Sequence, residues 1–226
     1  MNRLRIAPAL TVTAVLLTVL TMSACGNKPP VPGWQLNAKG SAERAAQAWL
    51  SGNSRVEAVE FARARHEVSS TGRADLVARL ELLRCATRVA ALVFEPCSGF
   101  EALAADAAPA EQAYARYLAG QAQPGDAALL PEAHRALAGG SAAPGPTLSG
   151  ISDPLSRLVA AGVLMRRGEA NPAVMDQAVQ AASGQGWRRP LLAWLLVQQQ
   201  RAVAGGAPEE AQRLQRRIEL LQEPPR

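Results

Sequence analysis

The chain has 226 residues, which is long enough to bury one hydrophobic core of ordinary size or two small helical subdomains. Its net charge of +5 is a mild and scattered excess, and this argues against a nucleic-acid-binding protein. The basic residues are nearly all arginines, since only Lys28 and Lys39 are lysines.

Residues 1–24 have the order of features of a secretory signal. Arg3 and Arg5 lie near the start of the chain, and an apolar run over residues 6–22 follows them. The small residues Ser23 and Ala24 come next. The run contains Pro8 and is shorter than the roughly 20 apolar residues that a membrane-spanning helix needs. We therefore expect a cleaved export signal rather than an uncleaved membrane anchor.

The stretch Met22-Ser23-Ala24-Cys25 resembles a bacterial lipobox, the lipidation signal of lipoproteins. The resemblance implies that Cys25 receives a diacylglyceryl group, that the leader is cut just before it, and that the new N-terminus is acylated. Several acyl chains on one cysteine make a stable anchor, because each buried methylene contributes about 0.8 kcal/mol. Gly26 follows instead of the aspartate that retains lipoproteins at the inner membrane of enteric bacteria, so the resemblance implies a place in the outer membrane, facing the periplasm.

The segment after the lipobox is rich in proline and glycine, and we expect residues 25–40 to be an extended tether between the lipid and the fold. Trp34 is expected to pack on the first helix rather than to touch the lipid interface.

Beyond Cys25 the chain has two cysteines, Cys85 and Cys97. An even pair in an exported protein favours a disulfide, because the periplasm is oxidising. A metal or redox pair is the alternative, but no histidine is near and there is no C-x-x-C.

From Ser41 onward the pattern is almost continuously helical, and it predicts an all-α fold. Residues 54–57 and 98–101 have the spacing of capping boxes, which predict helix starts. Between them we expect a helix over residues 73–93, ended by Pro96. Its two apolar stripes indicate packing on both sides. One stripe contains Leu76, Leu80 and Leu83, and the other contains Leu82, Cys85 and Val89.

Prolines recur every 18 residues in the second half, each at a plausible first helical position. They are Pro154, Pro172, Pro190 and Pro208. Asp153 and Asn171 are expected to cap two of the helices that begin at these prolines. Each unit of 18 residues is expected to form one helix and a tight turn. The stretch Gly206-Ala207-Pro208-Glu209-Glu210-Ala211 resembles the turn and second-helix start of a tetratricopeptide repeat.

This resemblance implies an α-solenoid of antiparallel helical hairpins over residues 151–223. Residues 41–138 then form an N-terminal helical region, which the resemblance covers poorly. Residues 139–150, rich in glycine and proline, are expected to link the two.

The chain carries few residues suited to catalysis. His66 and His134 are its only histidines, and both are expected to be surface or half-buried helix residues. No H-E-x-x-H, G-x-S-x-G, S-x-x-K or P-loop pattern is present, so we predict a protein that is not an enzyme and that uses no metal or cofactor. Glu101 invites comparison with the lone acid of helical cell-wall lyases, but its capping-box position is the preferred explanation.

The sequence has two aromatic clusters, one of Tyr114 and Tyr117 and one of Trp187 and Trp194. Each cluster is either part of the core or, if it is exposed on a concave face, a docking surface. Four arginines at expected helix ends are predicted to complement helix dipoles rather than to bind phosphate. These are Arg166, Arg167, Arg188 and Arg189.

Together, the patterns favour a lipid-anchored periplasmic scaffold that binds an unknown envelope protein and no nucleic acid. A cell-wall enzyme or enzyme activator is the alternative function, and a purely structural lipoprotein is a third.

Overall fold

A computed structural model describes residues 30–138 and 144–223; the leader, the lipobox and Cys25 lie outside this part. Every regular element within it is helical, which confirms the predicted all-α class. None of the described helices is long and apolar enough to cross a membrane. The elements are α2 (Gly33–Leu50), α3 (Ser54–Ser69), α4 (Ala74–Ala90), α5 (Ser98–Glu101), η1 (Ala104–Asp106), α6 (Pro109–Leu118), η2 (Asp126–Leu129), α7 (Glu132–Ala138), α8 (Pro144–Ser149), α9 (Pro154–Arg166), α10 (Pro172–Gly184), α11 (Arg188–Ala204) and α12 (Pro208–Gln222).

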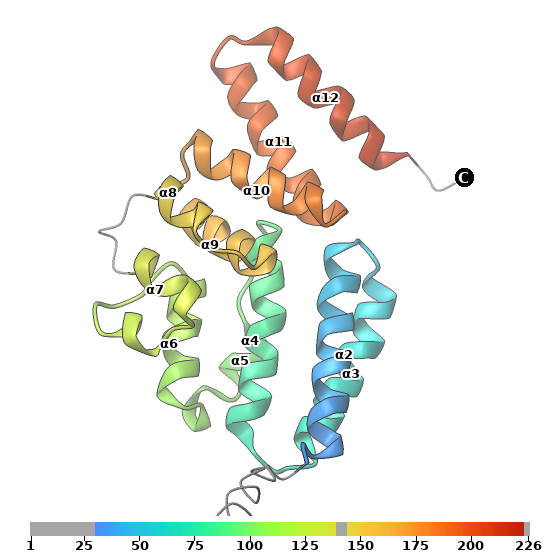
Figure 1. Ribbon diagram of the computed structural model, residues 1–226, viewed down its shortest axis with the longest axis vertical. Helices are drawn as coiled ribbons and strands as arrows, with labels where there is room; N and C mark the ends of the chain where they lie inside the picture. The colour runs from blue at the N-terminus through green and yellow to red at the C-terminus, as the bar shows by residue number, and fades with distance from the viewer. Residues whose placement is uncertain (1–29, 139–143, 224–226) are drawn as a thin grey trace, which may run out of the picture. The chain divides into compact units, whose positions relative to one another are not determined.

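The first hairpin, α2 and α3, begins inside the segment predicted to be a tether (Figure 1). The tether prediction for residues 25–40 is therefore wrong from Gly33 onward. Ala38 is buried in a small core that also contains Phe61 of α3. This packing holds the first turns of α2 in a helix although Gly40 has a low helix propensity, since tertiary packing outweighs intrinsic preference.

The start of α3 differs from the predicted capping box over residues 54–57. Asn53 is the N-cap residue, and its side-chain oxygen accepts a hydrogen bond from the N–H of Val56 at 3.1 Å. Glu57 is 4% exposed and accepts hydrogen bonds from Arg84 and Arg88 of α4. The prediction failed because this acid pairs across helices instead of reaching back to the start of its own helix.

The second predicted capping box, residues 98–101, does not form either. α5 is a single turn with Cys97 at the N-cap position, and no side chain caps it. Gly99 of this turn lies close to the Glu81 carboxylate of α4, which would have to move aside for a Cβ. Contact with α4 therefore fixes this segment rather than a cap of its own.

Helix α4 lies between the α2–α3 hairpin and α6 and also contacts α9, which confirms that it packs on more than one side (Figure 1). It ends at Ala90, before the predicted end at residue 93. Leu92 has a φ of 59°, so the N–H groups of Leu92 and Val93 bond back to the carbonyls of Val89 and Arg88. This is a Schellman ending with leucine at the position that usually holds glycine.

The predicted linker over residues 139–150 is wrong in its second part. Residues 139–143 lie outside the described residues, but residues 144–149 form α8. Leu148 of α8 has no exposed surface, and it belongs to the main core. The prolines of α8 lie in its first turn, where a missing N–H is tolerated, and Leu148 packs the segment onto the core.

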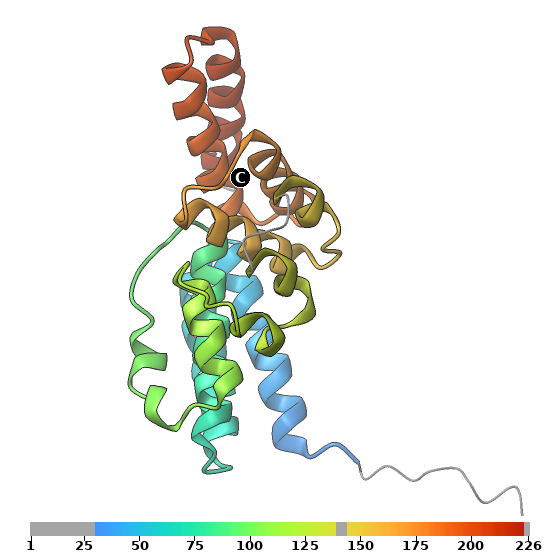
Figure 2. The same cartoon turned by 90° about the vertical axis from the view of Figure 1, so that its left-hand side faces the viewer.

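Helices α9 to α12 follow the 18-residue spacing of the prolines closely. Pro154, Pro172 and Pro208 stand at the first helical position as predicted, whereas α11 begins at Arg188 and holds Pro190 in its third position. The predicted caps are confirmed: the Asp153 and Asn171 side chains accept hydrogen bonds from backbone N–H groups at 2.7 and 3.0 Å. Each of these helices packs on the next, and Figure 2 shows α11 and α12 side by side.

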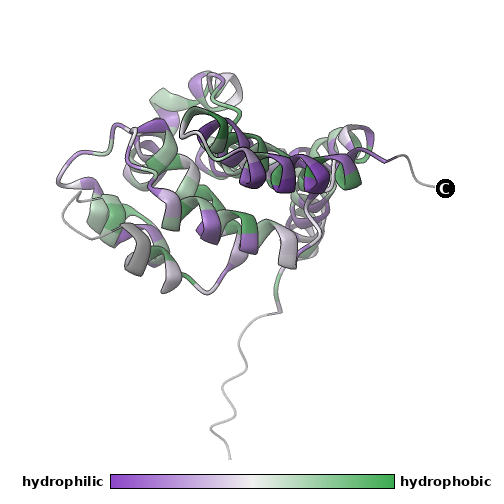
Figure 3. Cartoon of the chain, turned by 90° about the horizontal axis from the view of Figure 1, so that it is seen from above, coloured by the Kyte–Doolittle hydropathy of each residue, from purple (hydrophilic) through white to green (hydrophobic). Residues whose placement is uncertain are grey.

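The centre of the core is α9, in which residues 158–164 are all buried. A helix that is buried on every side carries no single apolar stripe. Gly162 allows the backbone of α4 to pass close by at Val89. The core cluster runs from Leu50 of α2 to Ile218 of α12, so the described chain from residue 33 onward forms one unit rather than two halves. Seen from above, hydrophilic residues cover much of the outer helix α12 (Figure 3).

Candidate functional site

The tryptophans of the predicted docking surface are buried. Trp187 is 7% exposed and Trp194 has no exposed surface. The indole N–H of Trp194 donates to the carbonyl of Ala90 at 3.1 Å, and that of Trp187 donates to Oε1 of Gln47 at 2.7 Å. These bonds connect α11 to α4 and α2. The docking prediction is wrong for both tryptophans, because the aromatic stripe of α11 packs into the core.

The tyrosine cluster is also mostly core. Tyr117 has no exposed surface, and its hydroxyl is hydrogen-bonded to Nδ1 of the buried His134 at 3.1 Å. Burial lowers the pKa of His134 to about 4 and raises the pKa of Tyr117. The predictions of a docking role for Tyr117 and of a surface or half-buried His134 are therefore wrong. Tyr114 is half-buried and stacks on Tyr117, and His66 is exposed as expected.

The arginines at helix ends divide into two pairs. Arg166 and Arg167 lie at the C-terminal end of α9, where cations complement the helix dipole as predicted. Their hydrogen bonds go to the carbonyls of Leu118 in α6 and Leu137 in α7. Arg188 and Arg189 are the first two residues of α11, where the helix dipole disfavours cations, so the predicted role is wrong for them. Arg189 instead stacks on Trp49, with 3.5 Å from Cζ to the ring centroid, and burial lowers its pKa.

A groove of about 810 Å³ is lined by α2, α4, α6, the ends of α3 and η2, and the two residues after η2, and we call it the α2–α4–α6 groove. Its volume lies within the range of known ligand sites, about 300–1,000 Å³. The groove is open to solvent rather than enclosed. Its apolar lining includes Leu76, Leu80 and Leu83 of α4, Ala38 and Ala42 of α2, and Tyr114 of α6.

Glu111 of α6 brings a buried carboxylate to this groove. Its side chain is 5% exposed, and Oε1 accepts hydrogen bonds from Nε and Nη2 of Arg79 at 2.8 and 2.7 Å. Oε2 is buried and has no hydrogen-bond partner among the described residues. A buried carboxylate oxygen without a donor is unfavourable, so this acid carries a desolvation cost in the free chain.

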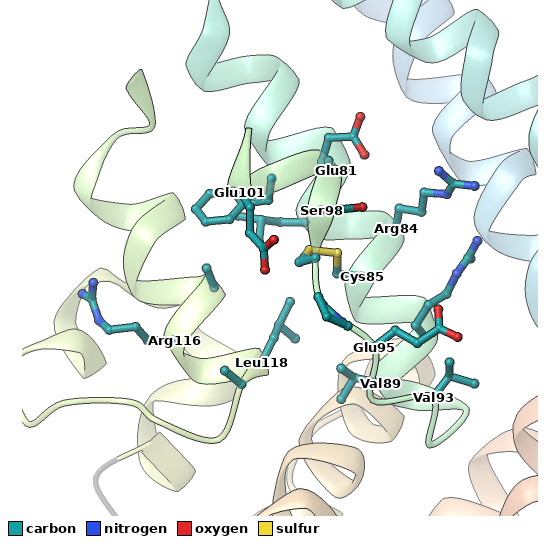
Figure 4. Close-up of a pocket in the computed structure, with 18 of the residues that line it drawn as sticks. Glu81, Arg84, Cys85, Val89, Val93, Glu95, Ser98, Glu101, Arg116 and Leu118 are labelled. Carbon is teal, nitrogen blue, oxygen red and sulfur yellow. A yellow bond between two sulfur atoms is a disulfide. The ribbon is translucent and has the colours of Figure 1, made fainter. Parts of the chain in front are cut away.

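A second pocket, of about 470 Å³, lies beside the predicted disulfide (Figure 4). The sulfurs of Cys85 and Cys97 are at bonding distance and their Cα atoms are 5.9 Å apart, which confirms the pair. The pocket is lined by charges of both signs, Glu101 among them. Its arginines are engaged: Arg116 binds the carboxylate of Asp126, and Arg84 binds Glu57. The acids Glu95 and Glu101 of this lining are exposed and form no ion pair among the described residues, so the unpaired charge of the pocket is negative.

Glu101 itself is exposed and lies among the labelled side chains of this pocket (Figure 4). Because its helix is a single turn without a side-chain cap, the capping explanation for this acid is wrong. In the part of the chain that the structure describes, no three His, Cys, Asp or Glu side chains are grouped so as to hold a metal ion.

Comparison of the chain with protein families, curated proteins and solved structures gives no match. The function must therefore be argued from the groove and the sequence signals. Sequence reasoning assigned the Leu76, Leu80 and Leu83 stripe to packing, and Leu80 is buried in a core cluster as that assignment predicts. It missed Glu111. The available signal was an acid beginning the short helix of Tyr114, which by itself is also typical of an ordinary helix start.

Proposed function

We propose that the chain is an outer-membrane lipoprotein that faces the periplasm and binds another envelope protein without catalysing a reaction. The lipobox resemblance at Cys25 supports the anchor. The bonding distance between Cys85 and Cys97 supports export, because disulfides persist in the oxidising periplasm and are rare in the cytosol.

The observation that carries the binding role is the α2–α4–α6 groove. Its lining combines apolar side chains, Leu76, Leu83 and Leu129 among them, with one buried acid, Glu111. The same lining includes the basic side chains Lys39, Arg73 and Arg79. Apolar surfaces with a few fixed polar groups are typical of recognition sites, in which burial supplies affinity and the polar groups supply orientation. The binding role thus moves from the buried aromatic residues to this groove.

Leu129 allows this role to be tested with little risk to the fold, because it lines the groove and is still 43% exposed. Leu196 of α11 is a matched control, since it is also a leucine and is 39% exposed, away from the groove lining. The tagged full-length chain is isolated from the envelope, and the co-isolated proteins are quantified for the wild type, Leu129→Arg and Leu196→Arg. We expect the same partner with the wild type and Leu196→Arg and its loss with Leu129→Arg. Identical background recovery from all three would refute the binding role.

A further inference from the structure

Part of the α2–α4–α6 groove is apolar surface that a partner can reach. The half-buried or exposed apolar and aromatic side chains of its lining include Trp34, Leu76, Leu83, Tyr114 and Leu129. Ala38 and Leu80 of the same lining are buried and belong to a core cluster. Covering the accessible side chains supplies affinity, but it does not by itself select a partner.

The charges of the lining select by sign. Lys39, Arg73 and Arg79 have side chains that are 74, 60 and 67% exposed. Glu111 is the one acid among the described residues that line the groove, and it is buried and already bound to Arg79. The accessible charge of the groove is therefore positive, which favours an anionic occupant.

The three cations keep donors for a ligand although each has an acidic partner. Lys39 and Glu43 lie 3.8 Å apart with both side chains mostly exposed, so this pair contributes little. Arg73 donates from Nε and Nη2 to Asp75, and a guanidinium has five N–H donors in all. Arg79 donates to the acid of the lining from the same two nitrogens. Neither Glu43 nor Asp75 lines the groove.

The positions of the cations decide between anionic occupants. Lys39 is on α2, whereas Arg73 and Arg79 are six residues apart at the start of α4, a rise of about 9 Å along a helix. Arg73 is directed to an acid of α4 and Arg79 to an acid of α6. An ordinary phospholipid has one phosphate, which fits cations that converge on one point. Carboxylates spread along a polypeptide fit cations that are held apart.

We propose that the groove binds a segment of the partner protein in which apolar residues are flanked by aspartates or glutamates. The apolar residues cover Leu76, Leu83 and Leu129, and the carboxylates meet Lys39 and Arg73. This inference rests on the proposed function, because it requires a protein partner. Opposite charges across an interface fix the orientation of the partner and disfavour partners of the wrong sign.

The first experiment uses the scarcity of lysine, since Lys28 and Lys39 are the only lysines of the chain. A water-soluble carbodiimide joins a lysine amine directly to a carboxylate that it contacts. It is applied to envelopes that carry the tagged full-length chain, and the cross-linked peptides are sequenced by mass spectrometry. Every strain carries Glu43→Gln, so that Lys39 cannot couple to its own neighbour.

We expect an amide between Lys39 and an aspartate or glutamate in one apolar stretch of another protein. Lys39→Arg should abolish this cross-link and still recover the partner, because it removes the amine but keeps the charge. An amide at Lys28 alone, or no amide at all while the partner is still recovered, would overturn the proposal.

The second experiment reverses one charge of the groove. The cross-linked stretch is synthesised as a labelled peptide, and its affinity for the purified full-length variants is measured by fluorescence anisotropy at low salt. Lys39→Glu should weaken binding by at least about fivefold, because an ion pair is lost and a repulsion replaces it. Arg216→Glu makes the same change of charge at an exposed position of α12 outside the groove lining, and it should bind within about twofold of the wild type. Equal affinities of the two variants contradict the assignment.

Further outcomes separate this inference from the proposed function. If the partner is lost with Leu129→Arg but binds Lys39→Glu and Arg216→Glu equally, the proposed function stands and this inference falls. If the wild type recovers phospholipid and no protein, both fall. Thermal unfolding of Lys39→Glu should remain close to that of the wild type, because its side chain is mostly exposed.

Discussion

Replacing Gly162 by alanine should destabilise the protein, although alanine is the better helix former. A Cβ at this position of α9 would overlap the carbonyl oxygen of Val89 and lie 2.9 Å from both its carbonyl carbon and Cγ1. The carbonyl is backbone, so it cannot rotate away, and α4 and α9 must separate. Overpacking of this kind costs about 3 kcal/mol at the upper end of its usual range, and the higher helix propensity of alanine offsets about 1 kcal/mol.

The expected net loss is therefore about 2 kcal/mol, which for a chain of this size lowers Tm by about 4–8 °C. Circular dichroism at 222 nm during heating measures it. Gly184→Ala is the matched control, because Gly184 ends α10 and a Cβ there meets nothing within 4 Å. That variant should melt at or slightly above the wild-type temperature. A Gly162→Ala protein that melts as high as Gly184→Ala would refute the close packing of α4 against α9.

Two further predictions concern the buried His134 and the Cys85–Cys97 bond, and a third concerns the exposed Glu101. Because burial lowers the pKa of His134 from 6.5 to about 4, only the unfolded chain takes up this proton between those pH values. The contribution of the neutral, buried His134 to the free energy of unfolding is complete above pH 6.5, and about 3 kcal/mol is lost as the pH falls to 4. Urea unfolding should show this decrease in the wild type but not in His134→Phe. Reduction of the Cys85–Cys97 bond, which closes a loop of sequence separation 12, should lower the free energy of unfolding by about 3 kcal/mol in the same assay, and an unchanged urea midpoint would argue against the bond. Neither the wild type nor Glu101→Gln should release muropeptides from purified sacculi, and release by the wild type alone would favour the cell-wall enzyme.

The local features of the fold were predictable because their signals lie within a few residues. Asp153 and Asn171 cap helices through the third residue that follows each, and the proline at the next position needs no hydrogen-bond partner for its missing N–H. These signals involve no distant contact. They therefore gave the positions of α9 and α10 correctly.

The groove and the buried acids could not be predicted in this way. Glu57 has the spacing of a capping residue, and only the approach of α4 with Arg84 and Arg88 makes it a buried ion-pair partner. Likewise, the groove joins Ala38 to Glu111, and nothing in the local pattern of either segment indicates the other. For the same reason the sequence left both core and docking surface open for the tryptophans, because an aromatic stripe looks identical whether its neighbour is solvent or another helix.

The most direct test of the account is metabolic labelling with palmitate in the native host, followed by separation of the envelope fractions. The account predicts that the wild-type chain is labelled and found in the outer membrane, whereas Cys25→Ser is unlabelled. An unlabelled wild-type chain, free in the cytosol, would contradict the central claim that this helical protein works from a lipid anchor.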